Sequence, residues 1–290
     1  MASGKLKIAA LASSFNRLQK TNAFLSSLLQ QTIPDNYTLD VYLLDDKSPD
    51  GTGDFVRQNF PTVTVIDGTG SLFWAGSMRT LWKYANENND YDFFLLLNDD
   101  VKLFDGAIDN LFKSYSKLNQ SPAIIVGTVH GFTEDDITYG GRKLLSRITG
   151  DSYIVIPDKT ELKECEFGNA NIMLVDKATV NKIGILAEDF THGVADYDYT
   201  MRAIEAGIKV WVAPGFYGFC EWDHGLPWLS GEHSLKERIA YLYSPKGLAY
   251  KEYLLYIKRH FPYMYPVLVL KLWGKTLFPW VFDFYKGKKQ

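Results

Sequence analysis

One run of residues constrains the fold of this 290-residue chain more than any other. The five apolar residues 93–97 lead directly into Asn98, Asp99 and Asp100. An apolar run of this length is typical of a strand buried on both faces, and such strands belong mainly to parallel sheets covered by helices. Because open α/β sheets bind ligands outside the carboxyl ends of their strands, we expect these acids to lie at a binding site.

The rest of the first 213 residues alternates between strand and helix patterns. Short apolar segments predict strands at 7–14, 39–44, 63–66, 93–97, 123–127, 171–175 and 209–213. Patterns of helical period predict helices at 18–29, 54–59, 106–118 and 177–183, one that ends near 88 and one from 198 to 207. Residues 130–165 are less regular and suit loops or a small hairpin layer. We therefore expect an α/β fold with a mixed, mostly parallel sheet flanked by helices.

Composition excludes several classes of protein. The net charge is −3, with 31 basic and 34 acidic residues, which argues against nucleic acid as a partner because phosphate binding usually shows as a basic excess. Only Cys165 and Cys220 occur, so neither a disulfide framework nor a zinc-binding spacing is present. No apolar run approaches the roughly 20 residues that span a bilayer. We expect a cytoplasmic chain that is soluble or attached to the inner face of the cytoplasmic membrane.

Adjacent carboxylates after a buried strand suggest a cation site. Two like charges at this separation stay ionised more easily beside a cation, and oxygen ligands suit Mg²⁺ or Mn²⁺. The alternative for Asp99 and Asp100 is a solvated turn, because Asn and Asp are common in turns whether or not they bind a ligand. The sequence alone leaves both interpretations open.

The C-terminal part of the chain differs in character. Aromatic residues make up 15% of the sequence, and many of them lie beyond residue 235 in short apolar helical patterns mixed with lysines. We divide the chain into an α/β domain that carries the candidate binding site, residues 1–235, and a helical, aromatic C-terminal extension, residues 236–290. Trp, Tyr and Lys suit a membrane interface. Packing on the α/β domain or on a second copy of the chain is the alternative.

Several motifs in order resemble those of one known family. They are Asn16-Arg17, the segment 45–52 (DDKSPDGT), the segment 70–76 (GSLFWAG), the segment 97–101 (LNDDV), Gly168-Asn169-Ala170, and Asp196-Tyr197-Asp198 followed by Arg202 and Gly207. Their order across about residues 7–225 resembles the inverting glycosyltransferase family 2, of GT-A fold, and its rhamnosyltransferase-like branch. Each motif is weak alone, whereas the joint order is specific.

The resemblance implies roles for residues near the carboxyl ends of the first strands. Asp100 is the expected metal ligand, with Mg²⁺ or Mn²⁺ bridging the donor diphosphate, and His224 is a second candidate ligand. Asp45 is expected to recognise the nucleobase, and turn formation is the alternative role for Asp46. Three further residues are expected at the nucleotide: Arg17, Gly70 and Asp99.

Asp196 is the expected catalytic base. An inverting transfer needs a group that takes the proton of the attacking hydroxyl, and a carboxylate at a helix start can be placed for this. The family usually carries an acid pair here, and this chain has Ala195 in place of the first acid. Helix capping is the alternative role for Asp196 and Asp198. Candidates on the acceptor side are Asn169, His192 and Asp198.

The resemblance implies a metal-dependent hexosyl- or rhamnosyltransferase. It would move a sugar from a UDP- or dTDP-sugar to a glycan or lipid-linked saccharide in bacterial cell-surface polysaccharide synthesis. The rivals are a nucleotidyltransferase, which predicts a glycine-rich, lysine-containing loop that residues 13–17 do not supply, and a non-catalytic binding module. We expect the side chains of Asp45, Asp100 and Asp196 to converge on one cavity.

Overall fold

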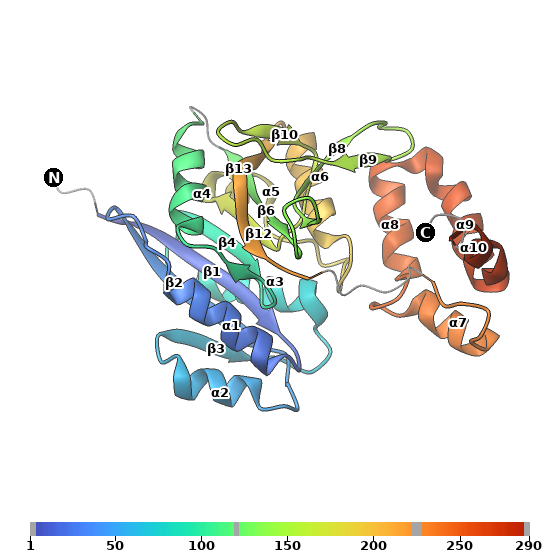
Figure 1. Cartoon of the computed structure of the whole chain (residues 1–290), viewed down its shortest axis with the longest axis horizontal. Coiled ribbons are helices and arrows are strands. Elements are labelled where there is room, and N and C mark those ends of the chain that lie inside the picture. The colour runs from blue at the N-terminus through green and yellow to red at the C-terminus, as the bar shows by residue number, and fades with distance from the viewer. Residues whose placement is uncertain (1–3, 119–121, 222–227, 287–290) are drawn as a thin grey trace.

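The computed structural model describes residues 4–118, 122–221 and 228–286. Within these residues a ten-stranded sheet has the order β10-β13-β6-β12-β4-β1-β2-β3, with β5 paired to β13 and β7 to β6 (Figure 1). Its strands are β1 (Leu6–Ser14), β2 (Tyr37–Asp45), β3 (Val63–Asp67), β4 (Phe93–Asn98), β5 (Lys102–Leu103), β6 (Ala123–His130), β7 (Ile137–Tyr139), β10 (Lys163–Cys165), β12 (Ile172–Asp176) and β13 (Lys209–Phe219).

The sheet is mixed, with a parallel majority among its long strands. Strands β3, β2, β1 and β4 pair in parallel. Strand β12 runs antiparallel to both β4 and β6, so β6 points the same way as β4, and β13 is parallel to β6. The predicted fold class is therefore confirmed. The carboxyl ends of β1 and β4 meet at one edge, where Ser13 pairs with Asn98.

Helices cover both faces of the sheet because its central strands are apolar on both. Along β4, Phe93 and Leu95 belong to one hydrophobic core, and Phe94 and Leu96 belong to the other. The first core includes residues of α1 (Leu18–Leu29), α2 (Thr52–Asn59) and α4 (Ala107–Ser116). The second includes residues of α3 (Phe73–Asn88) and α6 (Ala195–Glu205) and is flanked by α5 (Lys177–Ile183). The predicted buried strand is thus the centre of a three-layer structure.

The less regular segment forms the hairpin layer that the sequence suggests. Strands β8 (Gly141–Leu144), β9 (Ser152–Ile154) and β11 (Phe167–Gly168) make a second, three-stranded sheet. Three boundaries differ from the sequence prediction by more than two residues, and one of them is the end of β6, at His130 instead of residue 127. Helix α6 begins at Ala195 rather than at residue 198, and β13 continues to Phe219 through register shifts opposite β6. The longer α6 places Asp196 in its first turn.

Four α-helices and one 3-10 turn follow the described part of the sheet and lie together beside it (Figure 1). They are α7 (Leu235–Tyr243), α8 (Tyr250–His260), η1 (Pro262–Met264), α9 (Tyr265–Leu277) and α10 (Pro279–Lys286). A third core joins them to the sheet domain, since Leu254, Ile257 and Phe261 cluster with Phe167 and Phe190. The helical extension is therefore packed on the sheet domain, while the domain limit at residue 235 stays a prediction.

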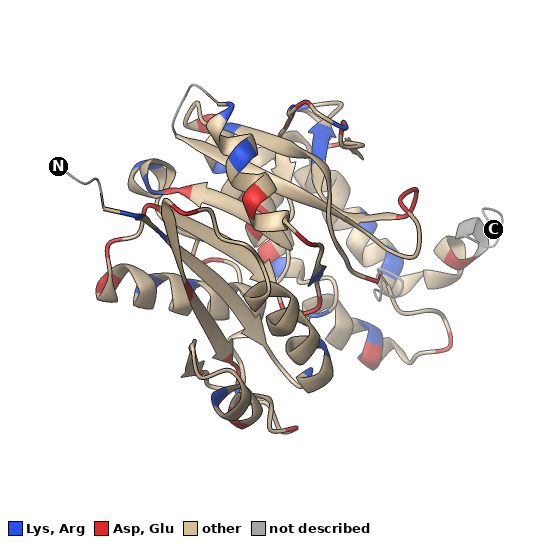
Figure 2. Cartoon of the chain, turned by 60° about the vertical axis from the view of Figure 1, so that its left-hand side comes forward, with Lys and Arg blue, Asp and Glu red and all other residues tan. Residues whose placement is uncertain are grey.

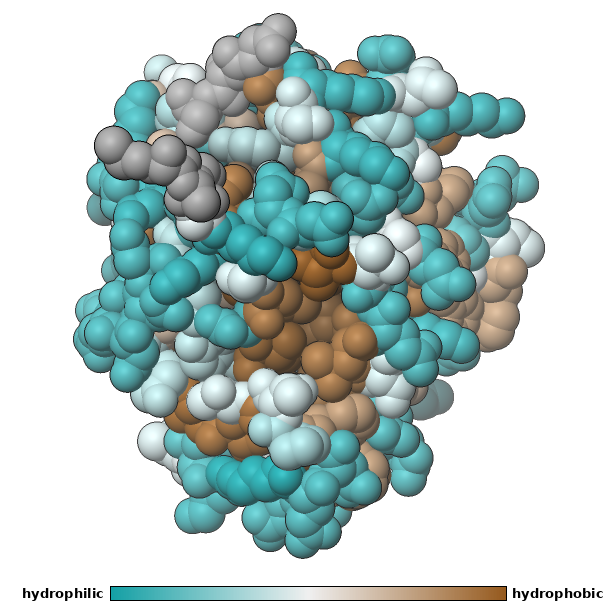
Figure 3. All heavy atoms as spheres, turned by 90° about the vertical axis from the view of Figure 1, so that its left-hand side faces the viewer, coloured by the Kyte–Doolittle hydropathy of each residue, from teal (hydrophilic) through white to brown (hydrophobic). Residues whose placement is uncertain are grey.

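Charged residues of both signs are interspersed over the molecule (Figure 2). On the face near the N-terminus, apolar residues gather in one central area that hydrophilic residues surround (Figure 3). Among the described helices, none is both long and apolar enough to cross a membrane.

Candidate active site

A cavity of about 380 Å³ opens where the carboxyl ends of β1 and β4 meet the start of α6. Its wall includes Arg17, Asp99, Asp100 and Asp196 from three distant parts of the sequence. The cavity is also lined by Gly70, Asn169 and His192, which the sequence analysis singled out. The topology thus brings seven of the ten candidate residues to one place.

The acids after β4 are held by Arg17, which precedes α1. Its Nη1 donates to Asp100 Oδ2 at 2.7 Å and to Asp99 Oδ1 at 3.4 Å. Thr21 Oγ1 donates to Asp99 Oδ2 at 3.1 Å. Burial raises the pKa of the Asp99 carboxyl to about 6, with the charge of Arg17 acting against this and that of Asp100 adding to it. The site is therefore anionic but partly neutralised by one guanidinium group.

Asp100 has one oxygen that can accept a further partner. Its Oδ1 is buried and accepts no hydrogen bond within the described part of the chain, while its Oδ2 is bound to Arg17. A buried carboxylate oxygen without a donor is costly unless a cation or donor completes it. No group of three acidic, His or Cys side chains suited to a metal occurs among the described residues. Asp100 thus fits a cation that takes its other ligands from a phosphate-bearing substrate, as Mg²⁺ commonly does.

Asp196 lies across the cavity, in the first turn of α6. Val194, the residue before this helix, has φ 54° and turns the chain into it. Asp196 Oδ1 accepts from the Tyr197 backbone N–H at 2.8 Å, and Oδ2 accepts from Ala170 N–H and Asn169 Nδ2, each at 3.3 Å. Burial raises the pKa of Asp196 above its usual range, although these hydrogen bonds act in the opposite direction. A carboxylate with a raised pKa is a stronger base.

Of the two acids that end β2, only Asp46 lines this cavity. Asp45 faces a separate depression with Lys47 and Asp67, and its carboxylate accepts a hydrogen bond from the Ser48 hydroxyl. The expected convergence is therefore met for Asp100 and Asp196 and not for Asp45. The base-recognition role of Asp45 stays a prediction, without support from its position.

Asp46 organises the loop that carries Gly70. Its carboxylate accepts from the backbone N–H groups of Gly70 at 2.7 Å, Leu72 at 2.9 Å and Phe73 at 3.2 Å. Gly70 has φ 88°, a conformation that suits glycine. The sequence analysis placed base recognition at Asp45 and left turn formation as the alternative role of Asp46. The alternation of side chains along a strand was the available signal that the two acids diverge.

Backbone strain gathers around the cavity. Four residues other than glycine have positive φ beside or within its wall: Asn16, Lys47, Phe73 and Val194. Such conformations cost energy and tend to persist at functional sites. Trp74, which the sequence did not assign to the site, donates from Nε1 to Asn98 Oδ1 at 2.8 Å and lines the cavity.

Asp198 does not line the cavity. Its side chain is 0% exposed and is paired with Arg202 at 2.9 Å, Arg259 at 2.6 Å and His260 at 2.9 Å. Burial acts to raise its pKa, but hydrogen bonds from His260 and Arg259, with the charge of Arg202, hold the pKa below its usual range. An acceptor role for Asp198 would require it to face the cavity, and the structure places it in an internal ion-pair network instead.

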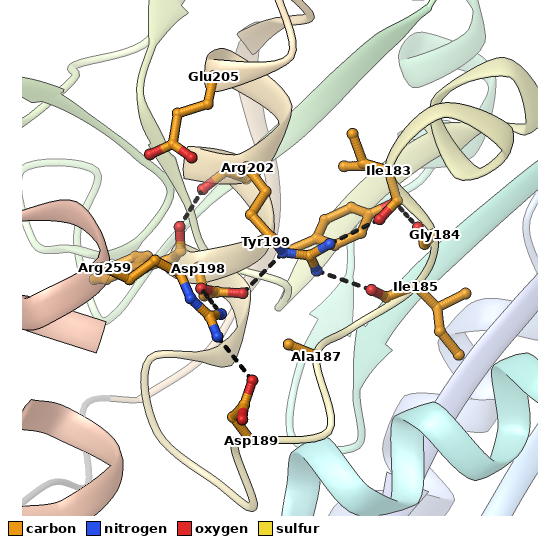
Figure 4. A network of polar contacts seen from close by, with 12 residues as sticks. Ile183, Gly184, Ile185, Ala187, Asp189, Asp198, Tyr199, Arg202, Glu205 and Arg259 are labelled. Carbon is orange, nitrogen blue, oxygen red and sulfur yellow. Dashed lines mark hydrogen bonds and ion pairs between the residues drawn. The ribbon is translucent and has the colours of Figure 1, made fainter. Parts of the chain in front are cut away.

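This network joins the C-terminal extension to the sheet domain (Figure 4). Arg259, from α8, reaches Asp198 on α6 and Asp189 in the loop before it. Arg202 binds Asp198 and donates to the carbonyl groups of Ile183 and Ile185. The remaining candidate, His224, lies outside the described residues.

Comparisons with known proteins concern the family and the fold of the chain. Residues 11–174, more than half of the chain, match the sequence profile described as "Glycosyl transferase family 2". Among solved structures, S. aureus TarS 1-349 in complex with UDP-GlcNAc has a TM-score of 0.54 at 16% identity, covering 76% of this chain and 60% of that one. The mannosyltransferase PcManGT from Pyrobaculum calidifontis, in complex with GDP-Man and Mn²⁺, has a TM-score of 0.54 at 14% identity, covering 78% and 60%.

The chain thus spans about 60% of the length of these two structures, and at such identities the likeness shows the fold. A search of curated proteins found no match. The family assignment therefore rests on the sequence profile, and the cavity described above lies where the fold expects its ligands. On these grounds the chain belongs to glycosyl transferase family 2.

Proposed function

We propose that this glycosyltransferase moves a sugar, with inversion, from a UDP- or dTDP-sugar to a hydroxyl of a glycan or lipid-linked saccharide. The observation that carries the proposal is that Asp100 and Asp196, which are distant in the sequence, line the same cavity. One similar structure holds UDP-GlcNAc and the other GDP-Man, which supports a nucleotide-sugar as the donor. A hexosyl or rhamnosyl donor, and a place in bacterial cell-surface polysaccharide synthesis, belong to the same proposal.

The chemistry assigns a separate task to each side of the cavity. The acceptor hydroxyl gives its proton to the Asp196 carboxylate while its oxygen forms a bond to the anomeric carbon. The bond from that carbon to the diphosphate breaks, and the nucleoside diphosphate leaves with the electron pair. Arg17, which already holds Asp100, supplies positive charge near the leaving diphosphate. When bound at Asp100, Mg²⁺ or Mn²⁺ would supply further stabilisation of that charge.

The test is hydrolysis of a UDP- or dTDP-sugar by the full chain in the presence of Mn²⁺. We expect Asp196→Asn to lower the hydrolysis rate by about 10²- to 10⁴-fold, the usual contribution of a general base. Donor binding, measured by thermal shift, should stay within about twofold, because the variant keeps the side-chain volume and the nucleotide contacts.

Asp135→Asn is the matched control, since Asp135 is exposed and outside the cavity. It should leave hydrolysis unchanged. Hydrolysis that persists in Asp196→Asn contradicts the assigned base, and a wild-type chain that binds no nucleotide-sugar contradicts the proposed function as a whole.

We also infer that the C-terminal extension contacts a membrane surface or a second copy of the chain. Large apolar side chains are exposed on it, among them Tyr263 at 76%, Leu270 at 75% and Trp280 at 58%. Large apolar side chains that stay exposed in one part of a chain are candidates for an interaction site. Membrane contact would place the enzyme beside a lipid-linked acceptor.

Flotation with phosphatidylglycerol vesicles separates the two alternatives. Membrane contact predicts that the full chain floats and that Leu270→Ser weakens flotation, whereas Phe132→Ser, at an 80% exposed residue outside the extension, does not. A full chain that stays in solution as a dimer supports the second alternative.

A further inference from the structure

A second cavity, of about 300 Å³, opens directly beside the first. His192, Gly193, Val194 and Lys246 line both cavities, so the two are neighbours across the loop that leads into α6. Val194 stands two residues before the proposed base Asp196. A substrate that occupies the second cavity can therefore extend toward the reacting carbon.

One face of α9 forms a wall of this cavity. Leu268, Lys271, Leu272 and Lys275 line it at spacings of three, one and three residues, which places them on one side of a helix. The loop between α7 and α8 supplies Lys246, with Leu248 and Ala249, and α8 supplies Tyr253. The C-terminal extension thus builds most of the second cavity.

The cavity is positively charged. Lys246, Lys271 and Lys275 line it, while no carboxylate does so among the described residues. No described carboxylate forms an ion pair with any of the three; Lys246 lies over the ring of Phe15 and Lys275 over that of Trp228. Burial, and then the charge of Lys271, lower the pKa of Lys275. A bound anion would reduce the electrostatic repulsion between Lys271 and Lys275.

The rest of the wall is apolar. Leu248, Leu268 and Leu272, with Tyr253, surround the lysines. A small polar anion such as inorganic phosphate would leave these side chains without a partner. A phosphate joined to a hydrocarbon chain matches both the charge and the apolar surface.

We propose that the second cavity is the acceptor subsite. It binds the phosphate and the apolar alcohol of a lipid-linked saccharide, whose sugar carries the acceptor hydroxyl toward Asp196. This inference rests on the proposed function, because only a transferase has an acceptor substrate. It selects the lipid-linked saccharide over the free glycan as the acceptor and assigns Lys271 and Lys275 to recognition of its phosphate.

The experiment measures binding of geranyl phosphate to the full chain by titration calorimetry. Geraniol tests the apolar part alone, and glycerol 3-phosphate tests a phosphate ester without the hydrocarbon. We expect geranyl phosphate to bind at least about tenfold more tightly than either, since each lacks one of the two matched features. Glycerol 3-phosphate binding as tightly as geranyl phosphate would overturn the apolar part and point to a phosphorylated glycan instead.

Variants connect the binding to the lysines. The double variant Lys271→Gln/Lys275→Gln should weaken geranyl phosphate binding by at least about tenfold, because it removes charge-assisted contacts. Lys258→Gln, on the exposed surface of α8 and outside the cavity, should bind like the wild type. Because Lys275 is partly buried, Lys271→Gln alone, at an exposed residue, serves as the second variant if the double variant does not fold.

Two results separate this inference from the proposed function. A wild-type chain that binds a nucleotide-sugar but not geranyl phosphate, or binds it equally with and without the lysines, overturns the subsite and leaves the transferase standing. A wild-type chain that binds geranyl phosphate through the lysines but binds no nucleotide-sugar overturns the acceptor role.

Discussion

Burial raises the pKa of Asp196, whereas three hydrogen bonds that its charged carboxylate accepts lower the pKa. Burial is the larger effect, so the pKa lies above that of an exposed aspartate, about 3.9. A base acts only when it is deprotonated. Activity should therefore be full at high pH and should fall as the pH drops through the raised pKa.

The side chain of Asn169 provides a test of this balance. Asn169→Ala removes a hydrogen bond that favours the carboxylate, so the acid limb of the pH profile of donor hydrolysis should move to higher pH. Asn88→Ala, at an exposed residue of α3, should leave the limb in place. A limb that stays unchanged or moves to lower pH in Asn169→Ala would show that this hydrogen bond does not set the pKa of the catalytic group.

The motifs of the sequence predicted Asp100 and Asp196 because the residue types follow predictable element ends, a buried strand and the start of a helix. They favoured Asp45 over Asp46, whereas Asp46 is the one of the two that lines the cavity. Neighbouring residues at the end of a strand point to opposite sides, and a shift of one position reverses the assignment. The environment of Asp198 was unpredictable for a related reason, since only the packing of α8 on α6 shows that its carboxylate faces inward.

At the scale of elements, one buried charge cluster fixes α8 to α6. Asp198 is 0% exposed and pairs with side chains from both helices. Its removal would leave Arg202 and Arg259 without their shared partner, which typically costs about 3–5 kcal/mol of the free energy of unfolding. We expect Asp198→Ala to be destabilised by about this amount in urea unfolding at pH 7.

The exposed pair of Lys83 and Glu188 is the control. Glu188 is 79% exposed in its side chain, so Glu188→Ala should cost less than about 1 kcal/mol. The cost of Asp198→Ala should shrink as the pH falls through the lowered pKa of Asp198, because protonation then removes the same charge from the wild type. Equal stabilities for Asp198→Ala and the wild type at pH 7 would contradict a structural role for the network.

Helices and strands with a strong hydrophobic pattern were predictable from the sequence, whereas strand pairing and the packing of helices were not. The apolar run at 93–97 gave the central strand, and its neighbours followed from the alternation of strand and helix. The order of strands depends on pairings between distant segments, such as β12 between β4 and β6, that no local pattern encodes. The packing of the C-terminal extension was likewise left open, because an apolar helical face fits a membrane, a partner or the domain itself.

At the scale of the whole molecule, the account depends on one cavity that receives a nucleotide-sugar between Asp100 and Asp196. The sheet brings these residues together from positions 96 residues apart in the sequence. The C-terminal extension closes one side of this region and builds the second cavity from α9 and the loop after α7. Donor and acceptor would thus approach Asp196 from the sheet domain and from the extension respectively.

The most direct test is a crystal structure of the full chain with UDP or dTDP and Mn²⁺. The account predicts that Mn²⁺ is bound by Asp100 Oδ1 and that the diphosphate lies in the cavity between Arg17 and Asp196. A nucleotide bound in the depression beside Asp45, or Mn²⁺ bound away from Asp100, would contradict it.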